Sequence, residues 1–405
     1  MPNCIIAQSG GPTSVINSSV VGLIKANEEF KVYDKVYGGL NGIEGILNNN
    51  IIDLSEMSSE EIDTFKLTPS SGLGSCRYKM KKLEDSTEEY DRLLDILKSL
   101  DIKTFFYVGG NDSMDTTAKL GKYAKETGLD INFIGIPKTI DNDLMYTDHT
   151  PGFGSAAKFI STVVLETYLD SSVYINNGIF IVETMGRDTG WLAASACTAM
   201  YGEKHVADFI YLPEKPFSIE NFLNDVRDKF NEQNHVFIVA SEGLKTENGK
   251  FLTEMNVVSQ DNFGHSQLGG VGQYLRELIL SAGITTRVKA LELGVLQRCA
   301  MHCASQIDID EAYNAGYEAL KAGAEGINGC MVAIKRESNS PYKSSFFLVE
   351  ADQIANNVKY FPSEWINEKG NGVTKEAYEY FIPLLNGVPT LYRNNHVPKY
   401  KVFTK

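Results

Sequence analysis

Two carboxylates stand two residues apart directly after an apolar run of the sequence. Asp141 and Asp143 follow the stretch Ile131–Ile136, and Lys138 precedes them. Ligands of open α/β sheets bind outside the carboxyl ends of such buried strands. On one turn, one carboxylate could accept a proton while the other helps to hold a divalent cation. An Asx-turn that only satisfies local backbone groups explains the same residues equally well, so the neighbouring motifs must decide.

Glycine pairs stand at two other junctions between an apolar stretch and a helical pattern. Gly10-Gly11 follows residues 3–8, and Gly109-Gly110 follows residues 104–108 and precedes Asp112. In such loops backbone N–H groups can approach a phosphate, and the helix N-terminus adds positive potential. Glycine is also common in purely structural turns, and an acid in the first helical turn is favourable in any protein. Neither loop matches a P-loop or a dinucleotide fingerprint.

Three further strand-like stretches end beside polar or charged residues. Arg187 follows one, Glu242 another, and Arg298 a third, while Arg77 lies in a loop of small residues. An arginine at such a place can clamp a phosphate, although a lone arginine on a loop is more often simply solvated.

The elements that must position these residues alternate between strand and helix patterns. Strands are expected at 3–8, 32–37, 104–108, 131–136, 178–184, 206–212, 235–240 and 287–293, and helices at 15–26, 58 onward, 86–100, 111–123, 155–169, 218–230 and 268–282. Capping-box spacing marks the starts at Ser58 and Ser86. This alternation predicts an α/β fold of two doubly wound, Rossmann-like lobes with mostly parallel sheets and an active site in the cleft between them.

Composition restricts the class of protein. The chain has 405 residues, 43% of them hydrophobic and 22% charged, with a net charge of -14. These values fit a globular protein without a general attraction to nucleic acid or anionic membranes. The six Cys show no zinc or disulfide spacing, no signal-peptide pattern is present, and no apolar run reaches about 18 residues. We therefore expect a cytoplasmic protein that binds neither membrane nor nucleic acid.

Five motifs occur in an order that is typical of one family. They are Gly10-Gly11, Gly109-Gly110-Asn111-Asp112-Ser113, Pro137-Lys138-Thr139-Ile140-Asp141-Asn142-Asp143, Met185-Gly186-Arg187 and Gln297-Arg298. In this order the sequence resembles the 6-phosphofructokinases over roughly its first three quarters. Any one of the motifs alone would be a weak signal.

The resemblance implies roles for individual residues. Asp141 is implied as the general base toward the C1 hydroxyl of fructose 6-phosphate, and Asp143 as a ligand of the cofactor Mg²⁺. Thr139 is implied to lie beside the phosphoryl group in transfer, and Glu242 to hydrogen-bond sugar hydroxyls. The residues implied to bind substrates are Gly11, Arg77, Ile140, Asp143, Met185, Gly186, Arg187, Glu242, Val295, Gln297 and Arg298, of which Gly11 and Arg77 belong to the phosphoryl-donor side and Arg298 to the sugar 6-phosphate.

Two departures from the ATP-using members concern the donor. This chain has Asp112 and Lys138 where those members have Gly, and it resembles the pyrophosphate-dependent branch at both positions. A carboxylate at the first position would repel an ATP α-phosphate, and an ammonium at the second would stabilise charge on the transferring group. The resemblance therefore implies that Asp112, Lys138, Thr139 and Asp141 are catalytic and that pyrophosphate is the donor.

Two more departures affect single contacts. Asn111 stands where many relatives have Asp, which removes a charge from the implied metal site but keeps an oxygen ligand. Val295 stands where His or Tyr usually precedes the Gln-Arg pair.

The expected domains are a donor lobe of residues 1–151 plus about 299–330, a sugar-phosphate lobe of 152–298, and a C-terminal extension of 331–405 packed on the lobes. The resemblance also implies a homodimer or homotetramer. An ATP-dependent phosphofructokinase and a non-catalytic sugar-phosphate-binding regulatory subunit remain as alternative functions.

Overall fold

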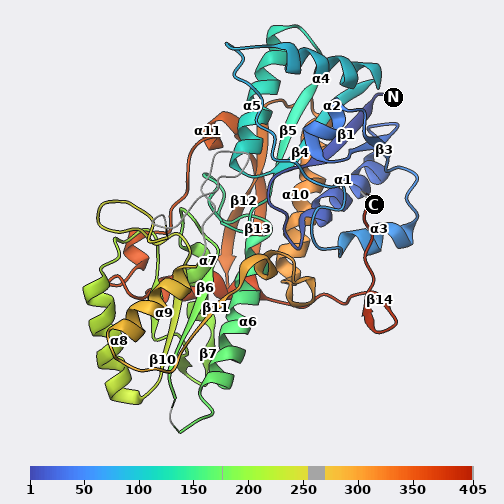
Figure 1. The fold of residues 1–405 in the computed structure, drawn as a ribbon. Helices are drawn as coiled ribbons and strands as arrows, with labels where there is room; N and C mark the ends of the chain where they lie inside the picture. Colours follow the sequence, from blue (N-terminus) through green and yellow to red (C-terminus); the bar gives the residue numbers. More distant parts are fainter. Residues whose placement is uncertain (176, 254–269, 404–405) are drawn as a thin grey trace. The chain divides into compact units, whose positions relative to one another are not determined.

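The computed structural model describes residues 1–175, 177–253 and 270–403, and these form two compact units. Unit 1 comprises residues 1–155, 298–358 and 386–405, and unit 2 comprises residues 156–297 and 359–385. Both units are therefore built from separate stretches of the chain (Figure 1).

Unit 1 is built on a seven-stranded sheet in the order β13-β12-β5-β4-β1-β2-β3. The strands are β1 (Asn3–Gln8), β2 (Val36–Gly39), β3 (Ile51–Asp53), β4 (Ile102–Gly109), β5 (Asn132–Pro137), β12 (Cys330–Asn339) and β13 (Tyr342–Glu350). The central strands pair in parallel, whereas β3 and β13 pair antiparallel at the two edges. β4 and β5 are buried along nearly their whole length, as expected for parallel strands that are covered on both faces.

Helices cover both faces of this sheet (Figure 1). One face packs against α1 (Ile16–Phe30), α3 (Ser59–Lys66) and α10 (Gln306–Ala324). The other packs against α2 (Gly42–Leu47), α4 (Glu88–Ser99) and α5 (Asn111–Glu126). The small helix α11 (Ala351–Ile354) directly follows β13.

Helices α1 and α10 approach closely because each carries a glycine where they cross. A Cβ on Gly22 would lie 1.8 Å from the Tyr313 carbonyl oxygen, and one on Gly316 would lie 1.8 Å from that of Ser19. Any side chain at these positions would force the two backbones apart.

Unit 2 contains a four-stranded parallel sheet in the order β11-β6-β10-β9. Its strands are β6 (Ile179–Thr184), β9 (Phe209–Tyr211), β10 (Val236–Ser241) and β11 (Val288–Glu292), and its helices include most of α6 (Phe153–Ser171), α7 (Trp191–Ser195), α8 (Ile219–Gln233), α9 (Val271–Ser281) and α12 (Lys375–Phe381). Helices α8 and α9 bury their apolar faces against this sheet. An aromatic cluster in which Trp191 contacts Phe361 and Trp365 joins the stretch 359–385 to the rest of the unit.

The predicted α/β class with mostly parallel sheets is confirmed. The capping box at Ser58 is also present, since its hydroxyl accepts from the Glu61 N–H and the Glu61 carboxylate accepts from the Ser58 N–H. The box expected at Ser86 is absent, because α4 begins one residue later than that spacing requires and Thr87 occupies the N-cap position without a capping bond. Leu268, the expected first residue of another helix, lies outside the described residues.

The stretch 331–405 differs from the extension that the sequence suggested. β12 and β13 complete the unit 1 sheet, residues 359–385 belong to unit 2, and residues 386–405 return to unit 1. The buried run Cys330–Ile334 explains the difference, because it pairs with β5 as another sheet strand. Among the described residues, no helix has both the length and the apolar composition that crossing a membrane requires.

Candidate active site

Three strands of unit 1 deliver their carboxyl ends to the same edge of the sheet. The hydroxyl groups of Ser9, after β1, and Ser113, after β4, are hydrogen-bonded at 2.5 Å. The Lys138 N–H, after β5, donates to the Gly109 carbonyl oxygen at 3.0 Å. The loops after β1, β4 and β5 therefore meet at this edge.

Lys138 lies at the centre of this meeting point. Its side chain is 3% exposed, and its Nζ donates to the Gly11 carbonyl oxygen at 2.7 Å. The pKa of Lys138 is lowered to about 8, mainly by burial. The nearby guanidinium groups of Arg298 and Arg77 contribute to the decrease, and the carboxylates of Asp141 and Asp143 oppose it. Four predicted site residues thus act electrostatically on one buried ammonium.

The turn after β5 holds the two carboxylates apart. Thr139 Oγ1 accepts from the Asp141 N–H at 3.1 Å and donates to the Asp141 carboxylate at 3.3 Å. Asn142 is fully buried in the left-handed conformation, with φ of 54°, and separates Asp141 from Asp143. Ile140 is buried below the turn. The threonine hydroxyl thus bonds both the backbone and the carboxylate of Asp141, the residue that the resemblance implies as the base.

Residues 147–152, here called the return arm, are hydrogen-bonded to this turn. Thr150 Oγ1 donates to the Thr139 carbonyl oxygen at 2.9 Å, and the Thr139 N–H donates to the Pro151 carbonyl oxygen at 3.3 Å. His149, within the arm, is completely buried between the carboxylates of Asp148 and Glu311, at 2.8 and 2.5 Å. Burial alone would lower the pKa of His149, but the two carboxylates outweigh it and raise that pKa to about 9.

The sequence analysis did not single out His149 or Glu311. The two residues lie 162 positions apart, so no local pattern could connect them. A histidine directly after an acid, Asp148-His149, was the only available signal, and it carries no spacing that points to α10.

The loop after β1 contains Gly10 and Gly11, and glycine is required there by the space and the backbone conformation. A Cβ on Gly11 would lie 2.8 Å from Nη1 of Arg298, and Gly10 adopts a φ of 75°. Arg298 therefore lies directly beside Gly11 and Lys138 in unit 1. Arg77 is exposed in the loop between α3 and α4. In the same loop, the Ser75 hydroxyl donates to the Gly10 carbonyl oxygen at 2.7 Å.

The predicted site residues between positions 185 and 297 lie in unit 2. The Met185 N–H donates to Gln297 Oε1 and the Gly186 N–H to Glu242 Oε1, each at 3.2 Å. Gly186 has a φ of 124°, and a Cβ on it would lie 2.6 Å from the Thr189 carbonyl oxygen. The loop after β6 is thus held by side chains from the ends of β10 and β11.

Arg187 is the cation among these unit 2 residues. Its Nε is buried and has no hydrogen-bond partner within the part of the chain that the structure describes. A buried guanidinium N–H without a partner is costly, so an anion at this position would be stabilising. Val295, in contrast, is 58% exposed and contributes no polar group.

Asn111 and Asp112 begin helix α5. The Asn111 amide is hydrogen-bonded to the backbone of residues 354–357. Within the described residues, no group of three or more His, Cys, Asp or Glu is arranged to hold a metal ion.

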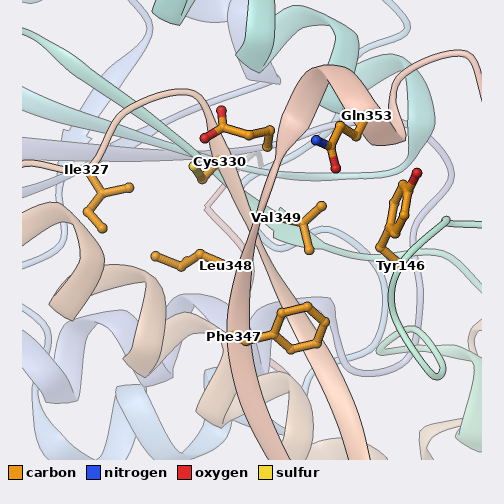
Figure 2. Close-up of a pocket in the computed structure, with 8 residues that line it drawn as sticks. Tyr146, Ile327, Cys330, Phe347, Leu348, Val349 and Gln353 are labelled. Atoms are coloured by element: carbon orange, nitrogen blue, oxygen red, sulfur yellow. The ribbon is translucent and has the colours of Figure 1, made fainter.

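An open hollow of about 600 Å³ lies elsewhere on unit 1 (Figure 2). It is lined by Tyr146, Ile327, Cys330, Phe347, Leu348, Val349, Glu350 and Gln353. None of the predicted site residues lines it, and its walls are mainly apolar, so it is unsuited to binding phosphates.

Comparison with known proteins identifies the family. The phosphofructokinase family model matches residues 3–322. This chain belongs to the phosphofructokinase family. A pyrophosphate--fructose 6-phosphate 1-phosphotransferase of Xanthomonas campestris pv. campestris (strain B100) is 39% identical over 401 residues, which cover 98% of this chain and 95% of the relative. A sulfofructose kinase of Alkalicoccus urumqiensis is 33% identical over 366 residues, which cover 90% of this chain and 92% of that kinase.

A solved structure agrees with these sequence relatives. The pyrophosphate-dependent phosphofructokinase of Nitrosospira multiformis matches with a TM-score of 0.88 and 35% identity, over 98% of this chain and 95% of its own. The resemblance to the pyrophosphate-dependent branch that the sequence suggested is thereby confirmed.

Proposed function

We propose that this phosphofructokinase transfers a phosphoryl group reversibly from pyrophosphate to the C1 oxygen of fructose 6-phosphate, giving fructose 1,6-bisphosphate and phosphate. The observation that carries the proposal is Lys138, an ammonium buried at the meeting point of three strand ends and bonded to the glycine loop. Two relatives that are 39% and 38% identical to this chain carry the name of this reaction.

We assign the role of general base to Asp141. Thr139 holds its backbone and its carboxylate, so the carboxylate can accept the C1 proton while the C1 oxygen attacks phosphorus. The new O–P bond forms as the bridging P–O bond breaks, and phosphate leaves. Lys138 would meet the charge that spreads over the transferring and leaving oxygens. We assign Arg298 to the same charge, and not to the 6-phosphate as the resemblance implied, because it lies beside Gly11.

Unit 2 supplies the groups for the sugar phosphate. The Nε of Arg187, which has no hydrogen-bond partner within the described part of the chain, suits the 6-phosphate. Glu242, which accepts from the Gly186 N–H, is assigned to the sugar hydroxyls. We assign Met185, Gly186 and Gln297 to the shape of this pocket.

Asp112 would determine the choice of donor. It lies in the first turn of α5, after Gly110, whose Cβ position is 3.5 Å from the Lys138 carbonyl oxygen. A carboxylate so near the donor site repels an additional phosphate, and pyrophosphate has none.

Mg²⁺ would neutralise charge on pyrophosphate, with Asp143 as its protein ligand. The Asp143 carboxylate is close enough to Lys138 to act on its pKa, which supports this role. The hydrogen bonds of Asn111 do not support it as a second ligand. A cytoplasmic location and a homo-oligomeric state stay predictions.

The test is an assay of the purified protein with fructose 6-phosphate and either pyrophosphate or ATP, together with the reverse reaction from fructose 1,6-bisphosphate and phosphate. Turnover with pyrophosphate in both directions supports the proposal. Turnover with ATP alone would favour the ATP-dependent enzyme, and binding of the sugar without turnover would favour a regulatory subunit.

The sulfofructose kinase relative supplies a second acceptor for the same assay. We expect fructose 6-phosphate to give the higher kcat/KM. A clear preference for sulfofructose would assign the chain to that relative's activity instead.

A further inference from the structure

The implied metal site contains a residue whose side chain is already engaged. Asn111 Nδ2 donates to the carbonyl oxygens of Asn357, at 2.5 Å, and Ile354, at 3.3 Å. Its Oδ1 accepts from the Asn356 N–H at 2.5 Å. Both ends of the amide are thus used by a single turn, which follows α11.

The turn also carries hydrogen bonds of its own, since the Asn357 N–H donates to the Ile354 carbonyl oxygen at 3.1 Å and Asn357 Nδ2 donates to the Gln353 carbonyl oxygen at 2.9 Å, but these bonds do not reach α5. Asn356 has a φ of 61°, a left-handed conformation, and its own side chain reaches Asp115 of α5 only at 3.3 Å. The three bonds of Asn111 therefore tie residues 354–357 to the start of α5, a contact between segments more than 240 positions apart in the sequence.

The chemistry of these contacts requires an amide. An Asp at position 111 could still accept from the Asn356 N–H, but it would turn carboxylate oxygens toward two carbonyl oxygens and could donate to neither. This explains why the chain has Asn at a position where an acid would be the better Mg²⁺ ligand.

We propose that Asn111 is a positioning residue that clamps the 354–357 turn to helix α5, and that it is not a ligand of Mg²⁺. The inference rests on the proposed function only in assuming that Mg²⁺ accompanies pyrophosphate. Neighbouring residues of a helix point about 100° apart. Fixing Asn111 on the turn therefore sets the direction of Asp112, the residue assigned to donor choice. The turn also directly precedes residue 359, where the chain enters unit 2.

Asn111→Asp tests the proposal most sharply, because the two roles predict opposite results. If residue 111 is a Mg²⁺ ligand, the substitution adds a negative charge to that ligand, so the Mg²⁺ concentration that half-saturates pyrophosphate binding should fall by about ten-fold. If residue 111 instead clamps the turn, the substitution removes the two hydrogen bonds that Asn111 Nδ2 donates, so amide hydrogen exchange in residues 351–358 should rise by about ten-fold. The Mg²⁺ requirement should then stay within about two-fold of wild type.

Three further measurements complete the design. Asn111→Ala should expose the Asn356 amide to exchange without changing the Mg²⁺ requirement. Asp143→Asn is the positive control and should raise that requirement by about ten-fold or more. The KM for pyrophosphate should rise in both Asn111 variants while the KM for fructose 6-phosphate is unchanged, a split that general destabilisation would not give.

Hydrogen exchange of the free protein and calorimetry with pyrophosphate and Mg²⁺ need no turnover, so an inactive wild type would overturn the proposed function without touching this inference. Lower Mg²⁺ demand in Asn111→Asp, or unchanged exchange at 351–358 in Asn111→Ala, would overturn the clamp.

Discussion

The site residues of unit 1 and those of unit 2 are built on different physical principles. In unit 1, buried or half-buried charges lie close together, and Lys138 has a pKa that burial lowers to about 8. In unit 2, the backbone of the loop after β6 donates to two side chains, the Gln297 amide and the Glu242 carboxylate, and Arg187 has a buried N–H without a partner among the described residues. The first arrangement suits a transition state in which charge moves, and the second suits a ligand whose charge is constant.

Replacing the implied base should have the largest effect, if this contrast is correct. Asp141→Asn removes proton acceptance but preserves the shape of the turn, so kcat should fall by roughly 10² to 10⁴. The KM for fructose 6-phosphate should change little. Steady-state kinetics in both reaction directions provide the measurement, and an unaltered kcat would mean that the base lies elsewhere.

A substitution in unit 2 should affect binding first. Arg187→Ala removes the cation assigned to the 6-phosphate, so the KM for fructose 6-phosphate should rise by roughly 10- to 100-fold. Arg187→Lys, which keeps the charge but loses the planar fork, serves as the matched control and should fall between wild type and Ala. A loss confined to kcat would contradict the separation of roles between the units.

The pH dependence of kcat/KM for pyrophosphate should report Lys138. Its pKa of about 8 lies below the ordinary value of 10.5, so the charged form is lost as the pH rises through about 8. The ammonium is the active form, and kcat/KM should therefore fall by up to about ten-fold per pH unit above that point.

Lys138→Arg is the control for this profile, because a guanidinium does not titrate in the same range. The variant should be slower but should lack the decline near pH 8. A decline that persists unchanged in Lys138→Arg would assign it to another group.

The sequence predicted the features that are local, and it missed those that distant segments create. The central strand, the alternation of elements and the family motifs each depend on short spacing, and the family and fold predicted from them are confirmed. The bonds of His149 to Glu311 and of Asn111 to the 354–357 turn join segments far apart in the sequence. Neither pairing follows from a local pattern, since only the packed fold determines which residue of α10 lies beside His149 and which turn lies beside Asn111.

The domain boundaries illustrate the same limit. The sequence predicts a return to the donor lobe at about residue 299 and an extension from residue 331, whereas the chain passes between the units at residues 155, 297, 358 and 385. The long-range pairing of β12 with β5 assigns the late strands to unit 1, and only the paired sheet reveals it. The roles of the individual site residues stay predictions until kinetics address them.

The most direct measurement is the donor preference of Asp112→Gly. Wild type and variant are assayed with fructose 6-phosphate and increasing pyrophosphate or ATP, with Lys138→Gly and the double variant beside them because the two positions are close enough to couple. The account predicts no ATP turnover in wild type, measurable ATP turnover with weakened pyrophosphate use in Asp112→Gly, and loss of the pyrophosphate reaction without gain of ATP in Lys138→Gly. An Asp112→Gly protein that keeps full pyrophosphate activity and still rejects ATP would contradict it.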